Sequence, residues 1–270
     1  MTREPRVTIL PVAAVATLAL FLSSPAPAGA EERQLAAGRP EAVTNALIDS
    51  LFDGSRLAVS PDTSFQHLLE EPTELDFGVE RGEPDEDGHV TLTWSDLHVV
   101  YAVPLEAFRA VLLDFDSHAD FVPRVVESPA EQVGTEPPRW RQRVKLSFRF
   151  LGFGADYAFH TEHQIEFDRG ANPDRHPTGH PNDQPNQPTE FGLRFRMVDT
   201  TTETLVDSGG TWYLKEVFIN DRPHTYVRYT NFAAFGRSIV GLRLALRNFG
   251  LRDVKSVMDA YFREALARTN

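Results

Sequence analysis

Apolar and polar residues alternate along two long segments in the middle of the chain, and a period of two predicts β-strands. In Arg139–Phe150 the apolar positions share one face with Gln142, and the opposite face is basic. In Asp156–Phe167 they share a face with Thr161 and His163, and the opposite face is mainly acidic. We therefore predict two antiparallel neighbours, with the basic row of one strand beside the acidic row of the other.

Further strand patterns precede and follow this pair. The segment Phe191–Val198 alternates in the same way and has a second basic row at Arg194 and Arg196. Turn residues at 220–223 favour a hairpin between the last two segments. The additional predicted strands are Val90–Tyr101, Phe191–Val198, Thr211–Ile219 and His224–Asn231.

Helical spacing occurs on both sides of the strand-rich region. After Pro104, apolar residues at Phe108, Val111, Leu112 and Phe115 follow the i, i+3, i+4, i+7 pattern of a helix. The end of the chain has two apolar stripes, within Ile239–Phe249 and after Gly250 as far as Leu266. The first stripe could belong to a mobile lid or to the first half of one long helix.

The chain divides into a short N-terminal region and one main domain. Residues 31–88 predict a helix over Pro40–Phe52 and an acidic, linker-like tract over Glu70–Gly88. Residues 89–270 form the main domain. Within it, residues 169–190 contain five prolines and no periodicity, which is typical of a surface insertion.

The first thirty residues resemble a secretory signal peptide. Arg3 and Arg6 precede the apolar stretch Val7–Leu22, and Ala28–Ala30 has the small-x-small pattern of a cleavage site. The alternative is an uncleaved anchor, but the apolar stretch is shorter than the ~20 residues that span a bilayer. We therefore expect a periplasmic or secreted protein with residues 1–30 removed. The chain has no cysteine, so we expect neither disulfides nor a lipid-modified cysteine.

The net charge and the sequence motifs argue against several classes of partner and cofactor. The formal net charge of −12 makes nucleic acid an unsuitable partner. No phosphate-binding or dinucleotide-binding glycine motif is present, so we expect no cofactor. His160 and His163 lie on opposite faces of a strand, and His176 and His180 lie in the proline-rich segment, so we expect no metal. We also expect no stable membrane anchor, and a monomer.

Three segments resemble the START-like (SRPBCC) superfamily, in particular its coenzyme Q-binding and polyketide cyclase-like domains. They are VPLEAFRAVLLDFDSHADFVPRVVES (103–128), GTWYLKEV (210–217) and TYVRYTN (225–231). His118 occupies a position where the superfamily usually has an aromatic residue. The resemblance implies an α+β helix-grip fold, in which a curved antiparallel sheet wraps around a long C-terminal helix. In that order the acidic strand lies between the two basic ones.

The resemblance also implies an apolar cavity between sheet and helix, of roughly 300 to 1,000 Å³. His163 could orient a ligand carbonyl, act as an acid or base, or serve as a hydrogen-bonded structural residue. The aromatic members of the inward rows would equally suit a solid core. The candidate lining residues are Trp140, Gln142, Phe148, Phe159, Thr161, His163, Phe195, Trp212 and Tyr229.

Two functions from different classes fit these features. The first is a non-catalytic protein that binds or carries a hydrophobic small molecule, such as a lipid, quinone or polyketide-like compound. The second is a cyclase- or dehydratase-like enzyme that uses the same cavity, and its distinguishing feature would be two inward titratable groups close together at the cavity. We favour the carrier, because the inward strand rows contain His163 alone. A scaffold for protein partners is a third possibility.

Overall fold

The computed structural model describes residues 56–60, 62–70, 74–81, 91–150, 153–169, 189–202, 204–236 and 242–269. The expected signal peptide, the expected helix over Pro40–Phe52 and residues 170–188 of the insertion lie outside this set. Helices in the described ranges do not include one that is long and apolar enough to cross a membrane.

One antiparallel sheet of nine strands dominates the described residues, in the order β1-β2-β9-β8-β7-β6-β5-β3, with β4 also paired to β5. The strands are β1 (Glu74–Arg81), β2 (Thr91–Tyr101), β3 (Val125–Glu127), β4 (Ala130–Thr135), β5 (Pro138–Phe150), β6 (Phe153–Arg169), β7 (Glu190–Thr200), β8 (Leu205–Ile219) and β9 (Arg222–Phe235). The helices are α2 (Phe65–Glu70), α3 (Leu105–Leu113), the 3₁₀ turn η3 (Phe115–Ser117), α4 (His118–Phe121) and α5 (Leu242–Thr269).

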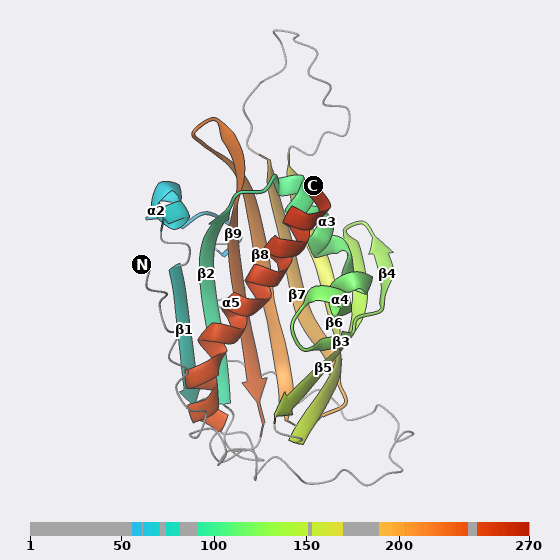
Figure 1. Ribbon diagram of the computed structural model, residues 1–270. Coiled ribbons are helices and arrows are strands. Elements are labelled where there is room, and N and C mark those ends of the chain that lie inside the picture. Colours follow the sequence, from blue (N-terminus) through green and yellow to red (C-terminus); the bar gives the residue numbers. More distant parts are fainter. Residues whose placement is uncertain are drawn as a thin grey trace, which may run out of the picture.

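The sheet curves around α5, which runs diagonally across its concave face (Figure 1). This confirms the predicted START-like helix-grip architecture. The helix is continuous from Leu242, so the described part of Ile239–Phe249 belongs to the gripping helix.

The main core lies between the concave face, α3 and the C-terminal half of α5. Phe108 and Val111 of α3 are fully buried, and Met258 and Tyr261 of α5 pack in the same cluster. Their spacing matches the helical stripes of the sequence. The core therefore holds α3 and α5 together against the sheet.

The predicted antiparallel pairing of β5 and β6 is confirmed, and residues of their inward rows lie opposite one another. Gln142 pairs with Thr161, and Trp140 pairs with His163. In the sheet β6 lies between β5 and β7, as expected from the helix-grip order. On the outer face its acidic row therefore lies between two basic rows. Arg141 reaches Glu162 at 2.7 Å across this ladder. Since such exposed pairs contribute only ~0 to 1 kcal/mol each, they mainly fix the register.

A β-bulge changes the face of Phe167. Ile165 pairs with Leu193 and Phe167 pairs with Gly192, so Glu166 is an extra residue in β6. Ile165 packs in the main core, whereas Phe167 packs with Tyr213 in the cluster on the outer face. The prediction that Phe167 shares the inward face is therefore wrong, because a bulge shifts the alternation by one.

Strand β1 corrects the expected linker over Glu70–Gly88. Residues 74–81 pair with β2 along their whole length, with Leu75 opposite Leu97 and Val79 opposite Thr93. Leu75 packs against the main core, and Val79 is buried. Apolar residues at every second position thus outweigh the acidic composition of the tract. Strands β3 and β4, which pair with β5, were not predicted from the sequence.

Candidate functional site

The three polar residues predicted on the inward rows are brought together. Gln142, Thr161 and His163 are between 4% and 7% exposed and lie on adjacent strands. Nε2 of His163 lies 3.0 Å from Oε1 of Gln142 and 2.9 Å from Oγ1 of Thr161. Burying polar groups without partners costs about 1 to 3 kcal/mol each, so these contacts offset much of that cost.

Two further residues that were not predicted from the sequence, His118 and Tyr261, complete this polar cluster. Nδ1 of His118, on α4, lies 3.2 Å from Nε2 of Gln142 and 3.3 Å from the hydroxyl of Tyr261 on α5. Both side chains are buried. The unusual histidine at position 118 was a signal, but only the packing of α4 against the sheet shows its partner. We call His118, Gln142, Thr161, His163 and Tyr261 the interior polar cluster.

The carbonyl of Phe115 determines the orientation of the cluster. Nε2 of Gln142 donates a hydrogen bond to this carbonyl oxygen at 3.0 Å, so Oε1 must face the other way, towards His163. An amide oxygen only accepts, so His163 must carry its proton on Nε2. The same amide nitrogen faces Nδ1 of His118, which therefore accepts, and His118 carries its proton on Nε2.

This assignment leaves one buried lone pair without a donor. With its proton on Nε2, neutral His163 has an acceptor on Nδ1. Nδ1 is buried, and the described protein atoms include no hydrogen-bond partner for it. The rings of Phe115 and Phe195 flank the imidazole, with centroids 4.4 and 5.9 Å away. The interior polar cluster thus has one unsatisfied acceptor in apolar surroundings.

Burial keeps both histidines neutral. Burial lowers the pKa of His163 to about 3, and the nearby charge of His118 contributes in the same direction. Burial lowers the pKa of His118 to about 4, although hydrogen bonds to backbone carbonyls, including that of Val111, partly oppose it. Burial also raises the pKa of Tyr261 well above its usual range. At neutral pH the interior polar cluster therefore has no charge of its own.

The aromatic candidates surround this cluster on the concave face. Trp212 packs on Tyr229, with ring centroids 4.3 Å apart, and its ring lies 5.0 Å from Tyr261. Trp140 and Phe195 are half-buried and pack against the same core. These contacts show that part of the concave face is filled by side chains, as in the solid-core alternative.

One candidate lining residue, Phe159, lies apart from this group. Phe159 packs with Met197 and Leu205 in a separate cluster. The side chain of Phe148 lies outside the described residues. The ligand-binding role of all nine candidates stays a prediction.

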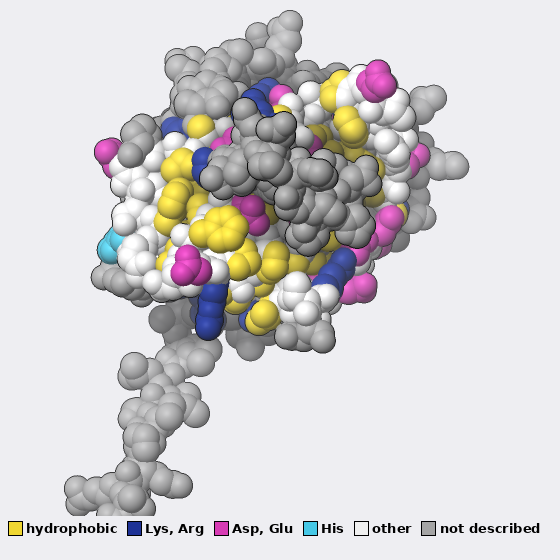
Figure 2. All heavy atoms as spheres, turned by 90° about the horizontal axis from the view of Figure 1, so that it is seen from above, with side chains coloured by type: hydrophobic (Ala, Val, Ile, Leu, Met, Phe, Trp, Pro, Cys, Tyr) yellow, Lys and Arg dark blue, Asp and Glu magenta, His cyan; other side chains and the backbone are white. Residues whose placement is uncertain are grey.

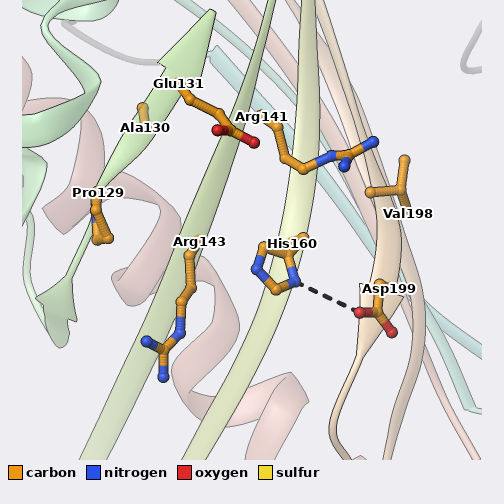
Figure 3. Close-up of a pocket in the computed structure, with 8 residues that line it drawn as sticks. All are labelled: Pro129, Ala130, Glu131, Arg141, Arg143, His160, Val198 and Asp199. Atoms are coloured by element: carbon orange, nitrogen blue, oxygen red, sulfur yellow. Dashed lines mark ion pairs between the residues drawn. The ribbon is translucent and has the colours of Figure 1, made fainter. Parts of the chain in front are cut away.

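A pocket of about 610 Å³ lies on the outer face, over β4, β5, β6 and β7 (Figure 3). Four of its titratable side chains already have a partner: Arg141 contacts Glu162, Arg143 contacts Glu127 at 3.5 Å, and His160 contacts Asp199 at 3.5 Å. Of the five titratable side chains that line the pocket, four are therefore engaged within the protein, and the fifth is Glu131.

Exposed apolar side chains occur at the end of the molecule where the β8–β9 hairpin projects and α5 finishes. Phe218, beside the hairpin turn, is 68% exposed, and Leu266 of α5 is 40% exposed. Figure 2 views this end from above and shows hydrophobic side chains grouped there among charged ones.

No protein-family model matches the chain, and no curated protein matches it. Solved structures with a similar fold do exist. The Zhui aromatase/cyclase from Streptomyces sp. R1128 is 16% identical, with a TM-score of 0.45 over 66% of this chain and 96% of that one. A STAR-related lipid transfer protein fragment from Xanthomonas axonopodis is 11% identical, with a TM-score of 0.45 over 70% and 98%. Human StAR-related lipid transfer protein 5 is 8% identical, with a TM-score of 0.44 over 72% and 88%. These likenesses concern the fold alone.

Proposed function

We propose that the mature protein binds and carries a hydrophobic small molecule between the concave face of the sheet and α5. In this proposal the apolar part of the ligand displaces or packs against the aromatic side chains of that face. Its polar group reaches the interior polar cluster. The mechanism is binding without a chemical step.

The observation that carries the proposal is the unsatisfied acceptor on His163. A core that served packing alone would be more stable with an apolar residue here, because an unpaired buried polar group costs about 1 to 3 kcal/mol. Small-molecule sites typically combine mostly apolar walls with a few convergent polar groups. Gln142, His163 and Tyr261 within an aromatic surface correspond to that combination.

The alternative enzyme function is supported by a separate observation. His118 and His163 both contact Gln142, and Tyr261 contacts His118, so titratable groups do lie close together. This meets the condition that His163 alone did not. However, a base with a pKa of about 3 or 4 accepts protons poorly at neutral pH, so general acid–base chemistry is disfavoured. Carriage therefore remains the better-supported function.

Export is part of the proposal. The features that support it are the basic start, the apolar stretch and the small-x-small site within residues 1–30. Outside the cytoplasm, an apolar molecule crossing an aqueous space requires a protein to shield it, because apolar surface is unfavourable in water. Export therefore supports carriage, because a protein outside the cytoplasm could shield an apolar molecule from the water there.

The test is to express the full chain with its first thirty residues in a Gram-negative bacterium and to purify it from the periplasm. Intact mass should show processing after Ala30. Native mass spectrometry and organic extraction should reveal a bound apolar compound, or the purified protein should take up fluorescent lipids. An unprocessed cytoplasmic chain would contradict export, and the lack of both bound compound and uptake would contradict carriage.

A matched pair of variants locates the site. Phe195→Leu reduces aromatic surface beside His163, whereas Phe218→Leu makes the same change on the exposed hairpin. We expect the first variant to weaken uptake several-fold and the second to leave it unchanged. Equal effects of the two substitutions would contradict binding at the concave face.

A further inference from the structure

The polarity of the ligand's head group can be inferred from the hydrogen-bond pattern around His163. The Phe115 carbonyl orients Gln142, and Gln142 fixes the proton of His163 on Nε2. Thr161 is a second acceptor for the same N–H group. Each step follows from the donor and acceptor character of the atoms.

The other side of the imidazole is therefore an acceptor only. Nδ1 is buried, and its lone pair has no donor among the described protein atoms. His163 as a whole is 7% exposed, so bulk water does not supply the missing donor. The two flanking rings, Phe115 and Phe195, offer apolar surface on either side.

We infer that the ligand of this site is a neutral, apolar molecule that carries a hydroxyl or N–H group and donates it to Nδ1 of His163. The inference rests on the proposed function and specifies which hydrophobic molecules the concave face takes. A ligand whose head group only accepts, such as a quinone carbonyl, an ester or an ether, would place its lone pairs against that of Nδ1. A quinol, a phenol or a long-chain alcohol would not.

Charged head groups are also disfavoured. A carboxylate would meet Nδ1 as lone pair against lone pair, and the interior polar cluster contains no cation to compensate its burial. Burial of an unpaired charge costs far more than burial of a hydroxyl. The site therefore selects neutral donors over fatty acids and other anions.

The inference is tested by comparing alcohols with their methyl ethers, which keep the apolar surface and the oxygen but lose the donor. Suitable pairs are 2-naphthol with 2-methoxynaphthalene, and 1-decanol with 1-methoxydecane. Dissociation constants of the purified mature protein are measured by titration calorimetry and tryptophan quenching. We expect each alcohol to bind about tenfold more tightly than its ether, the effect of one net hydrogen bond.

Two variants test whether Nδ1 of His163 causes the preference for alcohols over ethers. His163→Phe keeps an aromatic ring but removes the acceptor. In this variant the ether should still bind, and the ratio of the dissociation constants of ether and alcohol should fall to about one. His160→Phe makes the same change on the outer face and should leave the tenfold preference unchanged.

The outcomes separate the two proposals. Equal binding of alcohol and ether to the unmodified protein would overturn the inference and leave carriage intact, and would mean that Nδ1 meets a buried water only. A preference that survives in His163→Phe would also overturn it. Failure of every probe to bind would contradict the proposed function and the inference together. The alcohol–ether comparison needs no variant, so it holds even if His163→Phe does not fold.

Discussion

The side-chain oxygen of Gln142 lies 3.0 Å from Nε2 of His163, and this contact decides which nitrogen of the imidazole carries the proton. The amide cannot turn over, because its nitrogen donates to the carbonyl of Phe115. One glutamine therefore joins η3, β5 and β6, and it leaves Nδ1 as the nitrogen of His163 with the free lone pair. The proposed selectivity of the site depends on this single amide.

Replacing Gln142 should destabilise the protein strongly. In Gln142→Leu the Nε2–H of His163, Nδ1 of His118 and the Phe115 carbonyl all lose a partner, so we expect the free energy of unfolding to fall by about 2 to 4 kcal/mol. Urea unfolding followed by tryptophan fluorescence measures this change. Gln132→Leu is the matched control, because the side chain of Gln132 is exposed and donates a hydrogen bond to the Gly134 carbonyl. A loss below about 1 kcal/mol in Gln142→Leu would contradict the network.

The buried histidines should make stability fall in mild acid. His163 has a folded pKa of about 3 against an ordinary 6.5, so below pH 6.5 the unfolded chain binds a proton that the folded chain excludes. The free energy of unfolding should therefore fall by about 1.4 kcal/mol per pH unit from this residue as the pH drops from 6.5 towards 3. His118, which faces it across Gln142, adds a similar slope down to about pH 4.

The contribution of His163 is isolated by comparison with His163→Phe. The difference in unfolding free energy between the two proteins, measured from pH 7 to pH 5, should change by about 1.4 kcal/mol per unit below pH 6.5. Carboxylates that titrate in this range are common to both proteins and cancel. Parallel pH profiles would show that His163 is protonated normally in the folded state.

A buried ion pair on the outer face should be essential for stability. Arg228 donates two hydrogen bonds to Asp96, at 2.9 and 2.7 Å, and both residues are nearly inaccessible. Burial favours the neutral acid, but hydrogen bonds from Arg228 and His98 and the charge of Arg228 outweigh it, holding the pKa of Asp96 well below its usual range. Arg228→Met leaves a buried carboxylate with part of its compensation and should cost about 3 to 5 kcal/mol.

The control for this substitution is Arg141→Met. Arg141 makes a similar short contact to Glu162, but the pair is exposed to solvent. Its loss should change the free energy of unfolding by less than about 1 kcal/mol. Similar losses in the two variants would contradict the difference in burial.

Gly210 should tolerate no side chain. A Cβ atom there would lie 2.0 Å from the backbone oxygen of Thr230 and 2.7 Å from the ring of Phe195. Gly210→Ala should therefore destabilise the protein by at least about 1 to 3 kcal/mol and weaken ligand uptake, since Phe195 flanks His163. Gly134→Ala, where the nearest atom belongs to the flexible side chain of Arg139, should change stability by less than about 1 kcal/mol. Urea unfolding of the two variants tests the contrast.

Much of the fold could be predicted because alternation alone determines which residues share a face. The register of Gln142 with Thr161 and of Trp140 with His163 follows from two regular strands joined by a short turn. Where the chain departs from regularity, prediction failed. The extra residue at Glu166 turns Phe167 outwards, and bulges leave no simple signature in the apolar pattern.

The acidic tract shows a different kind of error. Leu75, Phe77 and Val79 alternate as a strand should, but the surrounding carboxylates suggested a solvated linker. The acidic composition of the tract predicted a solvated linker, whereas the two-residue period of its apolar residues indicated the strand that the structure contains.

The candidate site could be predicted only in part. The inward strand rows contain Gln142, Thr161 and His163, and periodicity finds them. His118 and Tyr261 come from α4 and α5, and their approach to Gln142 depends on how those helices pack on the sheet. Tertiary packing of this kind has no local signal, so the close pair of histidines was not foreseen.

The most direct test of the account is the ¹⁵N nuclear magnetic resonance of the histidine side chains during a titration with 2-naphthol. In the free protein at pH 7 we predict that His163 is neutral with its proton on Nε2. On saturation, the Nδ1 resonance of His163 should shift as it accepts a hydrogen bond, while His160 on the outer face should not change. A proton on Nδ1 in the free protein, or saturable binding that leaves the His163 resonances unmoved, would contradict the proposed site.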